Sequence, residues 1–378
     1  MLAGNGKITD RQFCRLLIMD WFAKGALLLP ALAGAVPVRS FILSLILGFL
    51  LALLYVRLLC GISAKVTGSF AQYLTEHLGK WALAGISVLF LVYAFVNVMY
   101  LTRAFAEIGV LFVVPESSRE LLMAMLLAAG AAVASGGLEV RARTASVLYP
   151  FVIYTMLLLI LAGAFSMNLE YLQPGTAVLD KKAWGLVGRV FLAFGGAGVF
   201  LFLMPQVTGR PRLAFQKGTF LTCVSLLALM LVLVGGYGEG GFKAMEWPAI
   251  ELMSGVELPG GFLQRWDVVF VGLLLMELFL AAGTSLYYLK LCGSNLRNCA
   301  GTPSARRMNR YRCANESNPR NGGGKRQIWL WAALAFLASA ACGSYERVVR
   351  IYTAVNRWTV AATVLLLLIL YGKTRWKR

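Results

Sequence analysis

The stretch VRSFILSLILGFLLALLYVRLLC, residues 38–60, is apolar and long enough to decide the class of this protein. About 20 apolar residues in a helix cross a hydrocarbon layer roughly 30 Å thick. Comparable runs recur along the chain, which is 59% hydrophobic and 14% charged, with a mean hydropathy of +0.72. Such a composition lies outside the range of soluble domains and predicts an all-α integral membrane protein.

The breaks between apolar runs predict about ten transmembrane helices in two sets of five. They are expected at residues 11–33, 38–60, 81–105, 119–136, 144–166, 186–208, 213–236, 262–291, 328–343 and 350–372. Because five is odd, the second set must lie upside down relative to the first, as in the inverted repeats of secondary transporters. We expect a single membrane domain over residues 1–378, with one repeat at about 11–166 and the other at about 186–372.

The formal net charge of +19 comes from 36 basic against 17 acidic residues. Nucleic-acid binding is not expected, because the basic residues occupy short gaps between apolar runs rather than one solvated face. Lys and Arg accumulate in cytoplasmic segments, and their distribution predicts that both termini are cytoplasmic. A basic cytoplasmic loop at about 293–326 and a basic tail at 373–378 are expected to lie against anionic headgroups of the bilayer.

The first expected helix contains the sequence DWFAKGALLLP at residues 20–30. A lysine within a span is costly in lipid, so Lys24 must face protein, water or a ligand. Gly25 and Pro30 favour a break in the helix, which makes Ala23, Lys24 and Gly25 candidate ligand-binding residues. A kinked helix in which Lys24 reaches one membrane interface is the alternative.

The sixth expected helix contains the sequence FGGAG at residues 194–198. Each glycine weakens a helix by about 1 kcal/mol relative to alanine, so this stretch is expected to unwind. The exposed backbone groups of an unwound helix can hold a carboxylate or an ammonium group. Phe194, Gly195, Gly196 and Gly198 are therefore candidate binding residues, and close packing of small residues is the alternative.

Further polar residues lie deep in the expected spans. Glu277 is a candidate partner of Lys24, a protonation site, or a neutral glutamic acid bonded to a neighbouring helix. Tyr93, Asn97 and Tyr100 recur at i, i+4 and i+7 and therefore share one helix face. They are candidates to line a pocket, although tyrosines of this kind also mark helix packing or the membrane interface.

The sequence favours neither an enzyme nor a resident cofactor. His77, the single histidine, has no second His or Cys at ligand spacing, so no metal site is expected. The seven cysteines follow no metal-binding pattern either. No phosphate-binding Gly-rich loop, Ser/His/Asp set or H-E-x-x-H motif occurs, and polar groups in the spans are too sparse for hydrolysis.

Five motifs give the chain a resemblance to a known family. They are KITDRQ at 7–12, the first helix through Gly25 to Pro30, LLYVR at 53–57, FAQY at 70–73 with LGKW at 78–81, and WPAIEL at 247–252 running into FLQRWD at 262–267. In this order they resemble the B subunit of spore germination receptors, a branch of the amino acid, polyamine and organocation permease superfamily. The resemblance implies a LeuT-like five-plus-five inverted repeat with broken first and sixth helices.

The resemblance also implies a function. A small germinant, often an amino acid, would bind between the first, third, sixth and eighth helices, and partner A and C subunits would complete the receptor. The chain departs from its relatives at Ala23 and Lys24, where two glycines are common, and at Gly196, where an acidic residue is common.

Three functions are weighed. The leading one is a germinant-sensing subunit in the spore inner membrane that binds a small molecule near the bilayer midplane and signals to its partners. The second is a proton-coupled amino acid permease in which Glu277 and Lys24 exchange protons. The third is a structural assembly subunit whose pocket has decayed.

Overall fold

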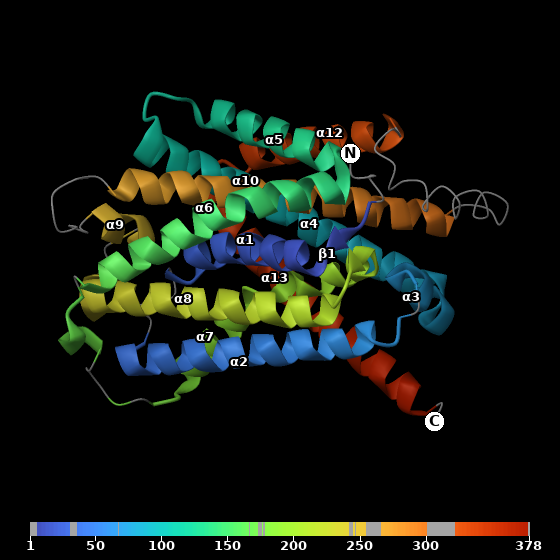
Figure 1. Ribbon diagram of the computed structural model, residues 1–378, viewed down its shortest axis with the longest axis horizontal. Helices are drawn as coiled ribbons and strands as arrows, with labels where there is room; N and C mark the ends of the chain where they lie inside the picture. The colour runs from blue at the N-terminus through green and yellow to red at the C-terminus, as the bar shows by residue number, and fades with distance from the viewer. Residues whose placement is uncertain are drawn as a thin grey trace.

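The computed structural model describes residues 6–30, 36–66, 68–165, 167–172, 176, 178–241, 245, 247–254, 266–300 and 322–376. Long helices run roughly alongside one another and form an elongated bundle (Figure 1). The first part of the chain contains β1 (Ile8–Thr9), α1 (Asp10–Leu28), α2 (Val38–Ser63), α3 (Phe70–Leu78), α4 (Lys80–Ile108) with a π-helical end η2 (Gly109–Val113), α5 (Arg119–Ser135), α6 (Gly137–Phe165) and the 3-10 turn η3 (Leu169–Leu172).

The second part begins with a helix that changes type. It contains α7 (Lys181–Leu192), the 3-10 segments η4 (Gly195–Phe202) and η5 (Met204–Gln206), β2 (Val207–Thr208), α8 (Pro211–Gly241), α9 (Pro248–Ser254), α10 (Trp266–Ala300), α12 (Gly322–Ala341) and α13 (Tyr345–Trp376). A helix therefore lies at each of the ten positions expected from the sequence.

Seven segments of the described chain are long and apolar enough to cross a membrane. They are Val38–Ser63, Lys80–Val113, Gly137–Phe165, Lys181–Phe202, Pro211–Gly238, Val268–Arg297 and Tyr345–Lys373. The outer helices carry large exposed apolar side chains such as Leu50, Phe151 and Leu365, which is what a surface facing lipid requires. The prediction of an all-α, multi-pass membrane protein is confirmed.

Side-chain caps explain where several helices begin. Thr9 Oγ1 accepts a hydrogen bond from Gln12 N at 3.3 Å, and Gln12 Oε1 accepts one from Thr9 N at 3.0 Å, so α1 starts at a capping box. The side chains of Ser118 and Asp180 cap α5 and α7 more simply, each by accepting one hydrogen bond from a backbone amide in the first turn. Polar residues at these positions therefore satisfy amide groups that the first turn of each helix leaves free.

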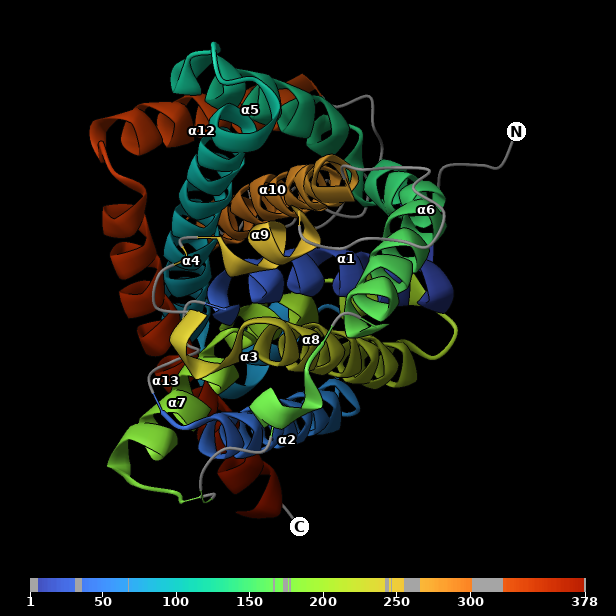
Figure 2. The ribbon, with the colours of Figure 1, turned by 90° about the vertical axis from the view of Figure 1, so that its left-hand side faces the viewer.

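Helices α1 and α10 lie in the middle of the bundle, with α4, α6 and α8 around them (Figure 2). In α1 the burial extends from Leu16 through Ala26 without interruption. Polar groups between Leu16 and Ala26 of α1 are therefore removed from both lipid and water.

A short parallel strand pair joins two distant parts of the chain. Ile8 pairs with Val207 and Thr9 with Thr208, and Thr208 Oγ1 donates to Ile8 O at 3.1 Å. The residues that enter α1 are thereby fixed to the residues that follow the 3-10 segments. This strand pair, α3 and the end of α13 lie toward the same end of the bundle (Figure 1).

Of the two helix breaks expected from the sequence, one is observed at the predicted place. The sixth helix does change at the predicted place, since α7 ends at Leu192 and a 3-10 helix starts at Gly195. The first helix does not break at Lys24 or Gly25, because α1 remains α-helical through both residues; it ends at Leu28, shortly before Pro30, and residues 31–33 of the expected helix lie outside the described chain. Gly25 instead admits α8, since a Cβ at this position would overlap the end of the Leu226 side chain.

The basic segments are more helical than expected. Helix α10 continues to Ala300 and α12 starts at Gly322, so the loop expected at 293–326 is shorter, and its residues 301–321 lie outside the described chain. Helix α13 continues to Trp376 and takes in most of the tail expected at 373–378, of which residues 377–378 lie outside the described chain.

Candidate functional site

A buried ion pair lies on α1 at the centre of the bundle. Lys24 Nζ donates to Asp20 Oδ2 at 2.7 Å, and both residues are 2% exposed. The two side chains meet because residues four apart lie on the same helix face. Of the three roles considered for Glu277, pairing with Lys24 is not observed, since Lys24 pairs with Asp20 one turn back on its own helix.

The ion pair leaves one polar atom unsatisfied. Asp20 Oδ1 is buried and has no hydrogen-bond partner among the described residues. The pair lies within electrostatic range of Tyr93 on α4, Tyr288 on α10 and Tyr352 on α13. The hydroxyl of Tyr288 is likewise buried and unpartnered in the described chain. A ligand that reached these buried groups would meet a carboxylate oxygen and the Tyr288 hydroxyl, both free to bond it.

Arg141 is a third buried charge, and it lies on α6, which packs against both α1 and α10. It is 1% exposed, its Cζ lies 5.0 Å from the centre of the Tyr287 ring, and it is within electrostatic range of Asp20. Neither Nη1 nor Nη2 has a hydrogen-bond partner among the described residues. Asp20, Lys24 and Arg141 together carry a formal charge of +1, and a buried excess charge of this kind favours an anionic group.

Sequence reasoning did not find Arg141. Its expected helix began at residue 144, which left Arg141 in a loop, whereas α6 begins at Gly137 and takes Arg141 into the bundle. Asp20 was seen beside Lys24 but not assigned a role, although the i, i+4 spacing of opposite charges was the available signal.

The glycines of the sixth helix lie where neighbouring side chains press on the backbone. A Cβ at Gly196 would overlap the Tyr93 hydroxyl, and a Cβ at Gly195 would overlap the Asn356 amide. At Gly198 it would lie 2.8 Å from Thr363 Cγ2. The small size of these three residues therefore lets α4 and α13 approach η4 closely, as the packing alternative requires.

A hydrogen bond from α13 stabilises the change of helix type. Asn356 Nδ2 donates to the carbonyl oxygen of Leu192, the last residue of α7. That carbonyl is one of the groups that a helix end leaves without an intrahelical partner. Asn356 is buried in a mostly apolar span, which is the signal that sequence reasoning did not use.

An aromatic cluster connects α1 to η4. The centre of the Trp21 ring lies 5.4 Å from that of Phe194 and 5.3 Å from that of Phe200, and Phe200 lies 5.6 Å from Tyr288. All these pairs are edge-to-face, an arrangement that aromatic rings prefer. Phe194 therefore contacts the residue next to Asp20, and packed rings connect α1 to η4.

The polar residues on α4 split into two groups. Asn97 Nδ2 donates to Ser285 Oγ on α10 at 2.6 Å, and Asn97 Oδ1 has no partner in the described chain. Tyr100 stacks on Tyr352 with 4.6 Å between ring centres. Tyr93 faces η4 and its ring centre also lies 6.5 Å from that of Tyr352, so Tyr93 and Tyr100 both pack against α13, whereas Asn97 binds α4 to α10.

Glu277 stands apart from the ion pair. It lies on α10 eleven residues before Tyr288, which is about 16 Å along a helix axis at 1.5 Å per residue. It is fully buried, and neither carboxyl oxygen has a hydrogen-bond partner among the described residues. An intramembrane carboxyl group without a partner is a functional candidate by default. Within the described chain, no group of three or more His, Cys, Asp or Glu is placed to hold a metal ion.

Comparison with known sequences identifies the family. A family model described as "Spore germination protein" matches residues 7–297. The chain belongs to this spore germination family. Among its relatives in Bacillus subtilis (strain 168), spore germination protein YndE is 22% identical over 74% of this chain and 78% of its own length. Spore germination protein A2 is 25% identical over 56% and 58%, and spore germination protein B2 is 20% identical over 69% and 72%.

The fold of this spore germination family member matches a known transporter. A Na+-coupled sialic acid symporter in its substrate-bound outward-open state superimposes with a TM-score of 0.64. The match covers 94% of this chain and 76% of the symporter at 13% sequence identity. The LeuT-like fold expected from the sequence is confirmed, and both family and fold are of the permease type.

Proposed function

We propose that this member of the spore germination family is a germinant-sensing membrane subunit. The observation that carries the proposal is the buried Asp20–Lys24 pair beside Arg141, with unsatisfied polar atoms on Asp20 and Arg141. Buried charges with free bonding positions at the centre of a permease fold are suited to a small polar ligand. The relatives are named as germination proteins, which favours sensing over nutrient uptake.

The ligand we propose is an amino acid. Its ammonium group would donate to Asp20 Oδ1, and its carboxylate would accept hydrogen bonds from Arg141. Each unsatisfied buried polar group costs about 1–3 kcal/mol, so a zwitterion that satisfies both regains that energy on binding. The formal charge of +1 on Asp20, Lys24 and Arg141 favours a ligand whose carboxylate accepts hydrogen bonds from these side chains with both oxygens.

Signalling would proceed through η4. A ligand bound at Asp20 changes the packing of Trp21 against Phe194 and Phe200, and these residues belong to the segment where the sixth helix changes type. Binding would shift the equilibrium between two arrangements of the bundle toward the one that the ligand binds more tightly. The size of the shift is set by the difference in the ligand's binding free energy for the two arrangements. A and C partner subunits in the spore inner membrane would respond to this change of arrangement. The domain would have ten spans in an inverted repeat, with both termini in the cytoplasm.

A proton-coupled amino acid permease is the second candidate, and Glu277 favours it. A buried carboxyl group with no partner is what a proton relay in a transporter uses. This function predicts that a pH gradient drives amino acid accumulation in proteoliposomes, and that Glu277→Gln abolishes it. Ligand binding without accumulation would favour the sensor.

Ligand-dependent thermal stabilisation tests the proposed site. The purified protein, alone and with its A and C partners, would be heated with each amino acid. A ligand at 100 times its Kd adds about 2.7 kcal/mol to the stability of the folded state. We expect this shift to be lost in Asp20→Asn and Arg141→Gln.

Arg143→Gln is the matched control, because Arg143 lies on the same helix but its side chain is 51% exposed and paired with Glu139. It should keep the full shift. Retention of the shift in both Asp20→Asn and Arg141→Gln would place the ligand elsewhere, and loss of the shift in Arg143→Gln as well would mean that the variants act on the fold in general. No shift with any amino acid, even with the partners present, would instead support a structural assembly subunit.

A further inference from the structure

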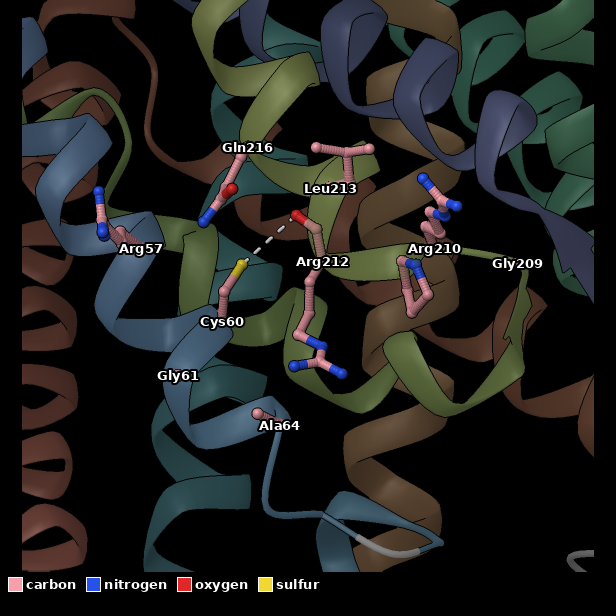
Figure 3. A pocket seen from close by; sticks show the side chains of 10 residues that line it. Arg57, Cys60, Gly61, Ala64, Gly209, Arg210, Arg212, Leu213 and Gln216 are labelled. Atoms are coloured by element: carbon pink, nitrogen blue, oxygen red, sulfur yellow. Dashed lines mark hydrogen bonds between the residues drawn. The ribbon is translucent and has the colours of Figure 1, made fainter.

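A cavity of about 520 Å³ opens between the end of α2 and the start of α8 (Figure 3). Three of its ten lining residues are arginines, and none is Asp or Glu. Arg57 comes from α2, whereas Arg210 and Arg212 come from the segment that starts α8. The volume is within the range of pockets that hold small ligands, about 300–1,000 Å³.

The three arginines of this cavity are free to bind a ligand. Each is exposed, and none forms an ion pair or a side-chain hydrogen bond with another described residue. The walls are nevertheless held together, because Cys60 Sγ on α2 donates to the backbone oxygen of Arg212 at 3.6 Å (Figure 3). The three arginine side chains point in different directions around the cavity (Figure 3), and because no carboxylate lines it they create a local excess of positive charge that favours an anion.

The position of the cavity points to a lipid. It lies at the ends of two segments able to cross a membrane, Val38–Ser63 and Pro211–Gly238. Leu54, Leu58 and Leu213 near it are 53%, 41% and 55% exposed, so apolar surface suited to acyl chains adjoins the charged cavity. A free anion needs no such surface, whereas a phospholipid uses both parts.

We propose that this cavity binds the phosphate group of an anionic phospholipid. Guanidinium groups form paired hydrogen bonds with phosphate oxygens, which makes arginine well suited to this group. The amino-terminal end of α8 adds partial positive charge on the same side. This site is separate from the ion pair on α1 and does not depend on the proposed germinant.

A lipid headgroup in the cavity would stabilise the segment between the 3-10 helices of the sixth span and α8. An adjoining cavity of about 320 Å³ shares Gly209 and Arg212 with the first and is also lined by Leu201 of η4 and Met204 of η5. A headgroup bound to Arg212 therefore lies against the link between the 3-10 segments and α8. Lipid composition would influence the stability of the same segment that contacts α1.

Lipid retention measured by native mass spectrometry tests the proposal. The full-length protein would be equilibrated in detergent with phosphatidylglycerol or phosphatidylcholine. We expect at least tenfold preference for phosphatidylglycerol, lost in the triple variant Arg57→Gln/Arg210→Gln/Arg212→Gln. A second triple variant, Arg57→Lys/Arg210→Lys/Arg212→Lys, keeps the charge and should retain most of the preference. If the triple Gln variant does not fold, the single variant Arg212→Gln replaces it and should lose part of the preference.

The matched control is Arg39→Gln/Arg347→Gln/Arg350→Gln, which removes the same charge from exposed arginines outside the cavity. Arg39 lies on α2 with Arg57 but about 27 Å away along the axis at 1.5 Å per residue. Equal lipid loss in both Gln triple variants would overturn the proposal, since only net charge would matter. Inorganic phosphate at millimolar concentration that displaces the lipid completely would overturn it as well, because a free anion would then be the occupant.

Discussion

The first and sixth helices look alike in sequence and differ in structure. Both carry glycine before a proline, yet α1 stays helical through Gly25, whereas the sixth helix changes to a 3-10 helix at Gly195. In α1 the polar chemistry comes from side chains, Asp20 and Lys24. In the sixth helix the polar groups are those of the backbone, and Asn356 donates a hydrogen bond to one of them, the carbonyl oxygen of Leu192. A single glycine that admits a neighbouring helix therefore does not unwind a span, whereas clustered glycines with a capping side chain do.

The largest test of this comparison removes one member of the ion pair in α1. Lys24→Ala leaves the Asp20 carboxylate buried without its partner, which costs about 3–5 kcal/mol. Thermal unfolding in detergent should show a large loss of stability. The double variant Asp20→Leu/Lys24→Met removes both charges and should recover most of it. Equal stability of Lys24→Ala and the parent protein would mean that Asp20 does not need Lys24 to neutralise its buried charge.

A smaller effect is expected where the sixth helix packs. Gly196→Ala places a methyl group against the Tyr93 hydroxyl, and overpacking of this kind costs about 1–3 kcal/mol. Gly188→Ala in α7 is the matched control, since nothing lies within 4 Å of a Cβ there. It should leave stability unchanged or raise it by up to about 1 kcal/mol through helix propensity. Similar losses in both variants would show that helix geometry, not the contact with Tyr93, sets the cost.

The smallest effect is expected at Gly25, and it separates packing from unwinding. Gly25→Ala meets the flexible end of Leu226, which can shift, so a loss of about 1 kcal/mol is expected in chemical denaturation. The double variant Gly25→Ala/Leu226→Val should recover it. A gain in stability for Gly25→Ala alone would contradict close packing and indicate open space beside α1.

The spans could be predicted from sequence because apolar runs and their breaks are local features. The change of the sixth helix was also predictable, since three glycines lie within the four residues 195–198. The break of the first helix was predicted wrongly, because only the approach of Leu226 shows what Gly25 is for. Arg141 was missed because α6 extends beyond its apolar run, and such an end is visible only in the folded chain.

The strand pair between β1 and β2 also sets an order of events during synthesis. Ile8 of β1 and Thr208 of β2, which share a hydrogen bond, lie 200 positions apart in the chain. At about 5–20 residues per second, the ribosome needs about 10–40 s to make that length. During this time α1, with Asp20 and Lys24, lacks the strand partner that fixes the residues leading into it. The i, i+4 ion pair needs no other helix, so it keeps the charges of α1 neutralised while the helix waits for the second half of the chain.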